Sequence, residues 1–138
     1  MQPFTHRHKV RFGEVDFAGI VYYPNFFNYY QHTEEEFLNH LGFWFHEMLG
    51  ERRQGFPIVH VEADFKRPVR LGDTLEIALH VARLGRSSAT FGFEVRTAGD
   101  PALRATAQIT HALLDLDAFA AIPLPQAMRE AFSRYLAA

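Results

Sequence analysis

Hydrophobic residues recur at intervals of three and four between Pro24 and Gly42, the spacing of an amphipathic helix. Proline is favoured at the first helical position because its missing N–H would have no partner there, and glycine commonly ends a helix. Tyr29 widens the apolar face, so the first turns are expected to be covered on most sides. The stretch 43–51 is expected to add a helical turn or two.

Alternating apolar and polar positions predict strands in most of the remaining chain. The strands cover residues 6–12, 56–65, 75–84, 88–96 and 104–114, and tight turns separate the last ones. Long strands joined by tight turns indicate an antiparallel sheet. A last segment, 125–136, has helical spacing again. The order predicts an α+β fold in which one long helix lies across an antiparallel sheet, with residues 1–138 forming a single domain.

Composition narrows the classes of function. The chain has 138 residues, with 14 Lys and Arg against 16 Asp and Glu, and this balance excludes a generally basic nucleic-acid binder. The absence of cysteine excludes a disulfide framework and a thiol nucleophile. No apolar stretch could span a bilayer and the amino terminus lacks the apolar core of a secretory signal, so a cytoplasmic location is expected. The 14 Phe, 5 Tyr and 1 Trp indicate more buried interior than a monomer offers, which predicts a homo-oligomer.

Charge is unevenly distributed along the chain. Residues 12–51 contain no Lys or Arg, but they include Glu14, Asp16, Glu34, Glu35, Glu36, Glu47 and Glu51. The rest of the chain is therefore basic on balance. An anionic ligand is expected to avoid the acidic block and to bind the basic remainder.

The loop before the long helix carries the clearest chemical signal. Asp16 precedes a flexible turn at Ala18 and Gly19, an apolar pair and the helix start. A helix start presents unpaired N–H groups and a partial positive charge, which can stabilise a developing oxyanion. The loop could thus hold a carboxylate near an electrophile whose oxygen faces the N–H of Tyr23, a geometry suited to attack on an acyl carbonyl. The alternative is that Asp16 only tightens the loop or caps the helix.

Residues 16–26, Asp-Phe-Ala-Gly-Ile-Val-Tyr-Tyr-Pro-Asn-Phe, resemble the signature of the hotdog-fold acyl-CoA thioesterases. The similarity is closest to the 4-hydroxybenzoyl-CoA thioesterase family, including its Tol-Pal-associated branch. It continues through Arg-Pro-Val-Arg-Leu-Gly-Asp at 67–73 and Gly-Arg-Ser-Ser at 85–88, and covers roughly residues 8–117. The resemblance implies a hotdog fold, in which an antiparallel sheet of about five strands wraps a long central helix, here with a C-terminal helix added. It also implies dimers joined edge to edge, with active sites between the subunits, and tetramers of such dimers.

The resemblance further implies roles for individual residues. Asp16 matches the catalytic carboxylate, which either attacks the thioester carbon or activates water, and Tyr23 matches the position whose backbone N–H polarises the carbonyl. A thioester suits this machinery because its carbonyl is less resonance-stabilised than that of an amide and its thiolate leaves with little protonation. The hairpin at Arg86 resembles the family region near the nucleotide end of CoA. Basic or hydroxyl side chains that could bind CoA are Arg86, Ser87, Ser88, Lys66 and Arg83, with Arg67 and Arg70 as further candidates.

Other ionisable residues have simpler interpretations. Glu36 could supply a second carboxylate, but Glu34, Glu35 and Glu36 fan out by about 100° each on a helix, so at most one can face the site. They are expected to form a solvated face with at most one structural contact. The 8 histidines contain no HExxH motif and no helical His pair four residues apart, so neither a metal nor a cofactor is expected. His60 and His111 fall on strands and are expected to be core or interface groups.

The leading hypothesis is an acyl-CoA thioesterase that releases a carboxylate and free CoA. The motif favours aromatic acyl groups such as 4-hydroxybenzoyl, with short acyl chains left open. Phe17 stands where the hydroxybenzoyl type carries a proline, which leaves the acyl preference open. The alternatives are a non-catalytic acyl-CoA-binding hotdog module and a hotdog dehydratase, which would need a histidine that the Asp16 loop lacks.

Overall fold

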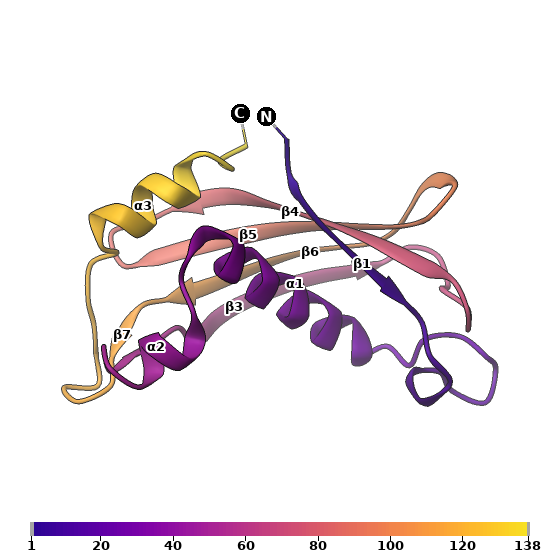
Figure 1. Ribbon diagram of the computed structural model, residues 1–138. Coiled ribbons are helices and arrows are strands. Elements are labelled where there is room, and N and C mark those ends of the chain that lie inside the picture. Colours follow the sequence, from indigo (N-terminus) through magenta and orange to yellow (C-terminus); the bar gives the residue numbers. More distant parts are fainter. Residues whose placement is uncertain (1, 138) are drawn as a thin grey trace.

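A long helix lies in the hollow of a curved antiparallel sheet in the computed structural model, which describes residues 2–137 (Figure 1). The helix is α1 (Asn25–Leu41). The sheet has five strands in the order β1 (Phe4–Lys9), β4 (Thr74–Leu84), β5 (Ser88–Thr97), β6 (Asp100–Ala112) and β3 (Ile58–Phe65). The predicted hotdog architecture, a five-stranded sheet around one central helix, is therefore confirmed.

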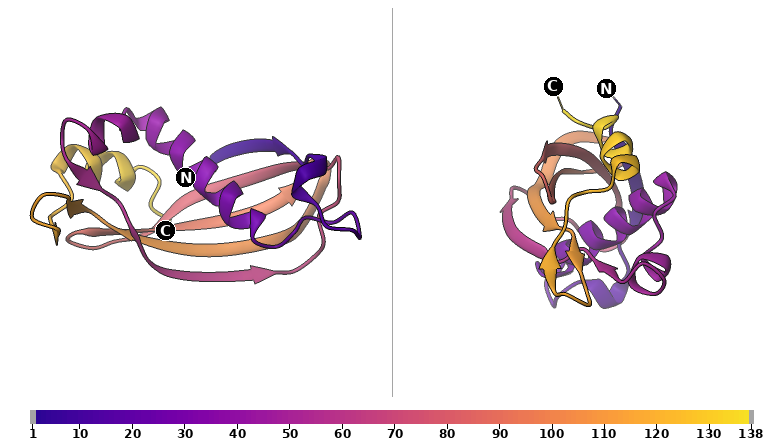
Figure 2. Two further views of the ribbon diagram at one scale, coloured as in Figure 1. Left: turned by 90° about the horizontal axis from the view of Figure 1, so that it is seen from below. Right: turned by 90° about the vertical axis from the view of Figure 1, so that its left-hand side faces the viewer.

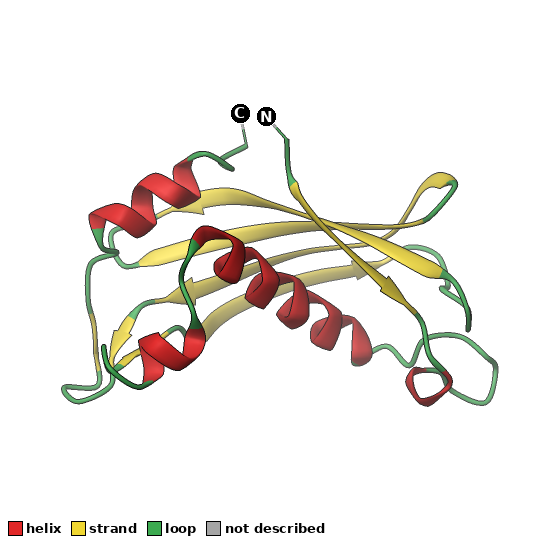
Figure 3. Cartoon of the chain, in the orientation of Figure 1, coloured by secondary structure: helices red, strands yellow, loops and turns green. Residues whose placement is uncertain are grey.

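Short elements complete the chain (Figure 3). A 3-10 turn, η1 (Phe12–Glu14), follows β1, and a short helix, α2 (Phe45–Leu49), follows α1. A small second sheet joins β2 (Gln54–Gly55), β7 (Leu114–Asp115) and β8 (Ala120–Ala121). The last helix, α3 (Gln126–Ser133), packs against β4. Among residues 2–137, no helix is long and apolar enough to cross a membrane.

The core forms between α1 and the inner face of the sheet (Figure 2). Alternate residues of β4 are fully buried, as their period-two pattern predicts. From the helix, Phe37 packs edge-on against Phe91 with ring centroids 5.8 Å apart, and Tyr30 lies 4.7 Å from Phe93. Each fully buried ring contributes about 2 kcal/mol, so this layer fixes the position of α1 on the sheet.

The ends of the long helix agree closely with the sequence, whereas the ends of several strands and of the last helix differ. Gly42 adopts φ 91° and its N–H caps the last turn, as expected for a glycine stop. The first strand was expected at 6–12 but spans Phe4–Lys9, because the chain turns into η1 once the Val10 N–H bonds Asp73 O at 2.9 Å. The helix expected over 125–136 is shorter, because the N–H of Val81 binds Tyr135 O at 2.8 Å and holds the chain end against β4.

One edge of the main sheet is apolar and exposed. Within residues 2–137, β3 pairs only with β6. Its Ile58, Val59, Val61 and Phe65 side chains are exposed. A free strand edge with apolar side chains is a template for pairing with another strand.

Candidate active site

The loop that carries Asp16 is a small hydrogen-bonded hairpin. The Tyr22 N–H donates to Glu14 O, and the Asp16 N–H donates to Ile20 O, each at 2.9 Å. At the tip, Gly19 adopts φ 78°, a conformation that glycine takes without strain. The backbone on either side of Asp16 is therefore held in a defined geometry.

A second segment closes the loop from the other side. The Val21 N–H donates to Val69 O at 2.8 Å, and the Leu71 N–H donates to Gly19 O at 3.0 Å. These bonds join two of the sequence stretches that carried the family resemblance, 16–26 and 67–73. Their separation in sequence gave no sign of this contact, which the tertiary fold creates.

Asp16 is half-buried as a residue. Its Oδ1 accepts a hydrogen bond from the Ala18 N–H at 2.9 Å, which is the turn contact that the structural alternative predicted. Its Oδ2 makes no hydrogen bond to any of the described residues. The side chain borders a largely apolar hollow of about 490 Å³, lined by Phe12, Gly13, Val15, Asp16, Phe17, Gly19 and Leu71. Oδ1 therefore orients the Asp16 side chain, while Oδ2 stays available as a hydrogen-bond acceptor or nucleophile.

The backbone amide of Tyr23 lies at the start of α1. The N–H groups of Tyr22 and Asn25 are both bonded, to Glu14 O and Tyr22 O, and Pro24 has no N–H. Within residues 2–137 the Tyr23 N–H makes no hydrogen bond. It therefore lies unpaired at the positive end of a 17-residue helix, where a partial negative charge is stabilised.

Tyr23 also borders a second hollow, of about 290 Å³. Its lining is mainly apolar but includes two cationic residues, and comprises Ile20, Val21, Tyr23, Phe26, Phe65, Lys66, Arg67, Pro68 and Val69. Lys66, a predicted CoA-binding residue, thus lies close to Tyr23. The hollow can accept a planar apolar group beside a cation.

The other predicted CoA-binding residues lie at the far end of the sheet. Strand β4 begins at Thr74, next to the Asp16 loop, and ends at Leu84, next to the hairpin of residues 85–87 (Figure 1). At about 3.3 Å per residue, its length separates the two ends by roughly 30 Å. Arg83, Arg86, Ser87 and Ser88 therefore do not meet Asp16 within one chain.

The hairpin at Arg86 has a support that the sequence did not reveal. Arg129 of α3 donates from Nη2 to Gly85 O at 2.7 Å and to Arg86 O at 3.1 Å. The C-terminal helix, which lies beyond the motifs that carried the resemblance in the sequence, thereby fixes the hairpin that carries the candidate CoA-binding residues. No local pattern could have identified this contact, since it joins residues more than forty positions apart.

The acidic run of α1 has a solvated face and one structural contact, as expected, and Glu34 makes that contact. Glu35 and Glu36 are exposed, but Glu34 is 2% exposed and its Oε2 lies 2.7 Å from Nε2 of His111, itself 4% exposed. Burial raises the pKa of Glu34, and the hydrogen bond with His111 acts against this rise. The sequence spacing already indicated that Glu34 is buried, because position 34 is four residues from both Tyr30 and Leu38, which lie on the buried face of α1. His111 is buried, as expected of a core or interface group, whereas His60, for which the expectation was the same, is exposed.

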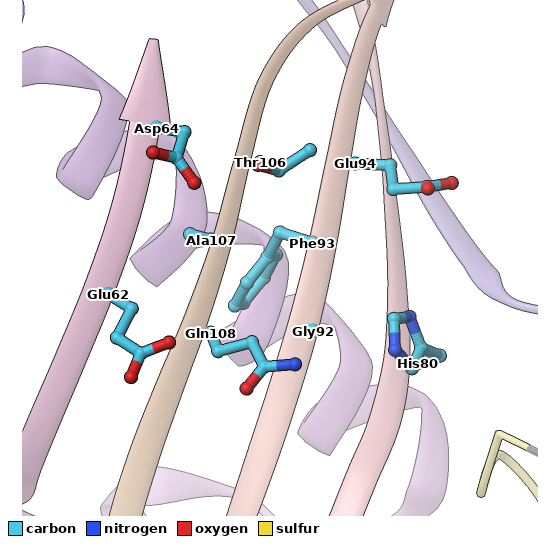
Figure 4. A pocket seen from close by; sticks show the side chains of 9 residues that line it. All are labelled: Glu62, Asp64, His80, Gly92, Phe93, Glu94, Thr106, Ala107 and Gln108. Atoms are coloured by element: carbon cyan, nitrogen blue, oxygen red, sulfur yellow. The ribbon is translucent and has the colours of Figure 1, made fainter.

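A third hollow, of about 300 Å³, lies on the outer face of the sheet, away from α1 (Figure 4). Glu62, Asp64 and Glu94 line it together with His80. The His80 ring lies over Gly92, where a Cβ would come within 2.3 Å of the ring. No group of three or more potential ligands suited to a metal occurs among residues 2–137. Three carboxylates would repel CoA phosphates, so this hollow is no candidate site for CoA.

A sheet wrapped around one helix is the hotdog architecture, and here an acid lies in the loop before the helix and a free amide at the helix start. The chain belongs to the thioesterase-like superfamily, whose family model matches residues 10–132. A 1,4-dihydroxy-2-naphthoyl-CoA hydrolase from Synechococcus elongatus is 31% identical over 131 residues, which are 94% of this chain and 95% of the relative. A putative esterase from Aquifex aeolicus is 35% identical over 95 residues, 67% of this chain and 72% of the relative.

Solved structures agree with this assignment. A 1,4-dihydroxy-2-naphthoyl-CoA thioesterase from Synechocystis superposes with a TM-score of 0.88 at 26% identity, covering 94% of this chain and 95% of that one. A gentisyl-coenzyme A thioesterase superposes with a TM-score of 0.81 at 28% identity, covering 91% of this chain and 98% of that one. The thioesterase family and the fold predicted from the sequence are confirmed, and the chain is a thioester hydrolase.

Proposed function

We propose that this protein hydrolyses an acyl-CoA thioester to a carboxylate and free CoA, with Asp16 and the Tyr23 amide as its catalytic groups. The observation that carries the proposal is an unpaired N–H at the helix start beside a hairpin whose carboxylate keeps one free oxygen. A thioesterase needs both an attacking oxygen and a donor for the carbonyl oxygen. A pure binding module gains nothing from a carboxylate held at an ester carbonyl.

In the proposed reaction, the thioester carbonyl oxygen accepts a hydrogen bond from the Tyr23 N–H, which stabilises the negative charge of the tetrahedral intermediate. Asp16 either attacks the carbonyl carbon or removes a proton from an attacking water. Collapse breaks the C–S bond and releases CoA thiolate, which takes a proton from solvent. By the first route a mixed anhydride forms and water opens it; by the second the acid forms directly. Both routes consume one water and yield the same products.

The acyl group that fits best is aromatic. The hollow beside Tyr23 is bordered by the rings of Phe26 and Phe65, which offer flat apolar surfaces to an aryl group. Three of the similar proteins named above carry the names of enzymes for hydroxylated aromatic acyl-CoA thioesters, 1,4-dihydroxy-2-naphthoyl-CoA and gentisyl-CoA. We therefore assign the chain to the aromatic-acyl branch typified by 4-hydroxybenzoyl-CoA thioesterase.

The cytoplasmic location expected for this protein stays a prediction.

Thiol release tests the function directly. Purified protein is mixed with 4-hydroxybenzoyl-CoA, 1,4-dihydroxy-2-naphthoyl-CoA and butyryl-CoA, and free CoA is measured with a thiol reagent. The chain has no cysteine, so the protein itself contributes no thiol signal. We expect kcat/KM for an aromatic substrate to exceed that for butyryl-CoA at least about tenfold, a difference of roughly 1.4 kcal/mol. Tight binding without CoA release would instead identify a non-catalytic module.

The proposed enzyme is a dimer joined through β3. Its exposed apolar edge supports pairing with the β3 edge of a second copy. A two-fold axis across antiparallel edges brings the far end of one sheet toward the near end of the other. Arg86 of the partner subunit would then approach the Asp16 loop, which would account for their roughly 30 Å separation within one chain. Association of such dimers into tetramers stays a prediction.

Lysine substitutions on the β3 edge test whether the dimer forms through it. Val59→Lys combined with Val61→Lys is expected to give a monomer in light scattering and to lower kcat/KM for the preferred acyl-CoA at least about tenfold, since charged edge strands do not pair. Leu49→Lys changes another exposed apolar residue, on α2, and serves as the control with an unchanged oligomeric state. A monomeric variant with full activity would contradict the composite site.

A further inference from the structure

Glu14, at the end of η1, joins three elements through one carboxylate oxygen. Its Oε1 accepts hydrogen bonds from His8 Nε2 of β1 at 2.8 Å, from the Tyr29 hydroxyl of α1 at 2.7 Å and from the Arg11 N–H at 3.2 Å. Tyr29 is buried and its ring packs 4.9 Å from the His8 ring. The carboxylate is thus held between the first strand and the first turns of the central helix.

The ionisation of this cluster favours strong hydrogen bonds. Burial raises the pKa of Glu14, but the hydrogen bonds from His8 and Tyr29 outweigh burial and lower that pKa overall. Burial and the Glu14 charge raise the pKa of Tyr29, so its hydroxyl keeps the proton that it donates. Charge-assisted hydrogen bonds of this kind are about twice as strong as neutral ones.

The backbone carbonyl of Glu14 binds both sides of Tyr23. It accepts from the Tyr22 N–H and from Nδ2 of Asn25, each at 2.9 Å. Tyr22 and Asn25 flank the Tyr23–Pro24 pair in sequence, and Glu14 itself is two residues from Asp16. Glu14 therefore holds two segments of the chain, the one that carries the Asp16 carboxylate and the one that carries the Tyr23 amide.

We propose that Glu14 and Asn25 are positioning residues that set the distance between the Asp16 carboxylate and the Tyr23 N–H. The inference rests on the proposed function, in which these two groups act on one carbonyl. A displacement of about 1 Å between reacting groups can cost about a hundredfold in rate, so the link between the two chain segments matters even though neither residue touches substrate. The Asn25 amide is the part of this link that a substitution can remove without altering the backbone.

Asn25→Ala tests the inference. We expect kcat for the preferred acyl-CoA to fall about tenfold or more while KM changes less than about threefold, because the geometry of attack is altered and CoA binding is not. Asn25→Gln, which keeps an amide donor, should restore part of the lost kcat. Asn39→Ala is the matched control, since Asn39 lies on the same helix fourteen residues further on and its side chain makes no hydrogen bond with Glu14 or Asn25. Its kcat should stay within about twofold of the wild-type value.

Amide hydrogen exchange supplies a readout that does not depend on activity. The Tyr22 N–H should exchange about tenfold faster in Asn25→Ala than in Asn39→Ala, because the shared acceptor, Glu14 O, is held less firmly without the Asn25 amide. Wild-type kcat in Asn25→Ala, or equal Tyr22 exchange in the two variants, overturns the inference. An inactive wild-type protein would overturn the proposed function instead, and the exchange rates would then decide alone whether Asn25 holds this junction.

Discussion

Replacing Asp16 with asparagine is expected to lower kcat for the preferred acyl-CoA at least about a hundredfold, a loss of roughly 3 kcal/mol in transition-state stabilisation. Asparagine keeps an oxygen that can accept the Ala18 N–H bond, seen at 2.9 Å, so the turn survives. It loses the negative charge, and an amide neither attacks a thioester nor deprotonates water at neutral pH. KM should change little, because the other contacts to CoA remain. Free CoA release under saturating substrate measures the effect.

A second loop aspartate provides the control for this prediction. Asp115 Oδ1 accepts the Asp117 N–H at 3.1 Å, which is the same turn contact at a site remote from Tyr23. Asp115→Asn should keep kcat within about twofold of the wild-type value. If the two variants behave alike, Asp16 only tightens its loop and the structural alternative is correct.

Replacing Glu34 with alanine is expected to lower the free energy of unfolding by about 3–5 kcal/mol. His111 Nδ1 lies 2.7 Å from Phe56 O and therefore carries a proton, while Nε2 lies 2.7 Å from Glu34 Oε2 and shares a second one with it. The His111 ring also stacks on Phe56, with centroids 4.6 Å apart, so it cannot turn toward water without disrupting the core. Removing Glu34 leaves a buried ring nitrogen without a partner and a cavity beside it. Denaturant unfolding measures the loss.

Three further variants separate the hydrogen bond from the charge. Glu34→Gln can donate from its amide to a neutral His111 and should cost less than about 1.5 kcal/mol. Glu35→Ala, at the exposed neighbouring position, should stay within about 0.5 kcal/mol of the wild-type value. The double variant Glu34→Leu with His111→Phe removes both polar groups together and should approach or exceed wild-type stability. An unfolding midpoint for Glu34→Ala equal to that of Glu35→Ala would show that the pair contributes nothing.

Local signals made much of the fold predictable. Pro24 before the helix, Gly42 after it and the apolar spacing between them act within a few residues, and the helix that they predicted spans Asn25–Leu41. Alternation in β4 and β5 depends on the period of the strand itself, so those strands were also found with close boundaries. The motif at 16–26 identified the family because its residues are contiguous and need no partner to be recognised.

The tertiary structure alone decided which distant groups meet. Glu34 and His111 are 77 residues apart, and only the packing of α1 on β6 turns an acidic run into a buried pair. Arg129 holds the hairpin at Arg86 through carbonyl oxygens, which no side-chain pattern encodes. Strand β4 places Arg86 far from Asp16, and the free edge of β3 follows from strand order. Helix caps and strand alternation are settled by energies within a few neighbouring residues, whereas burial and hydrogen-bond partners depend on chain segments that only folding brings into contact.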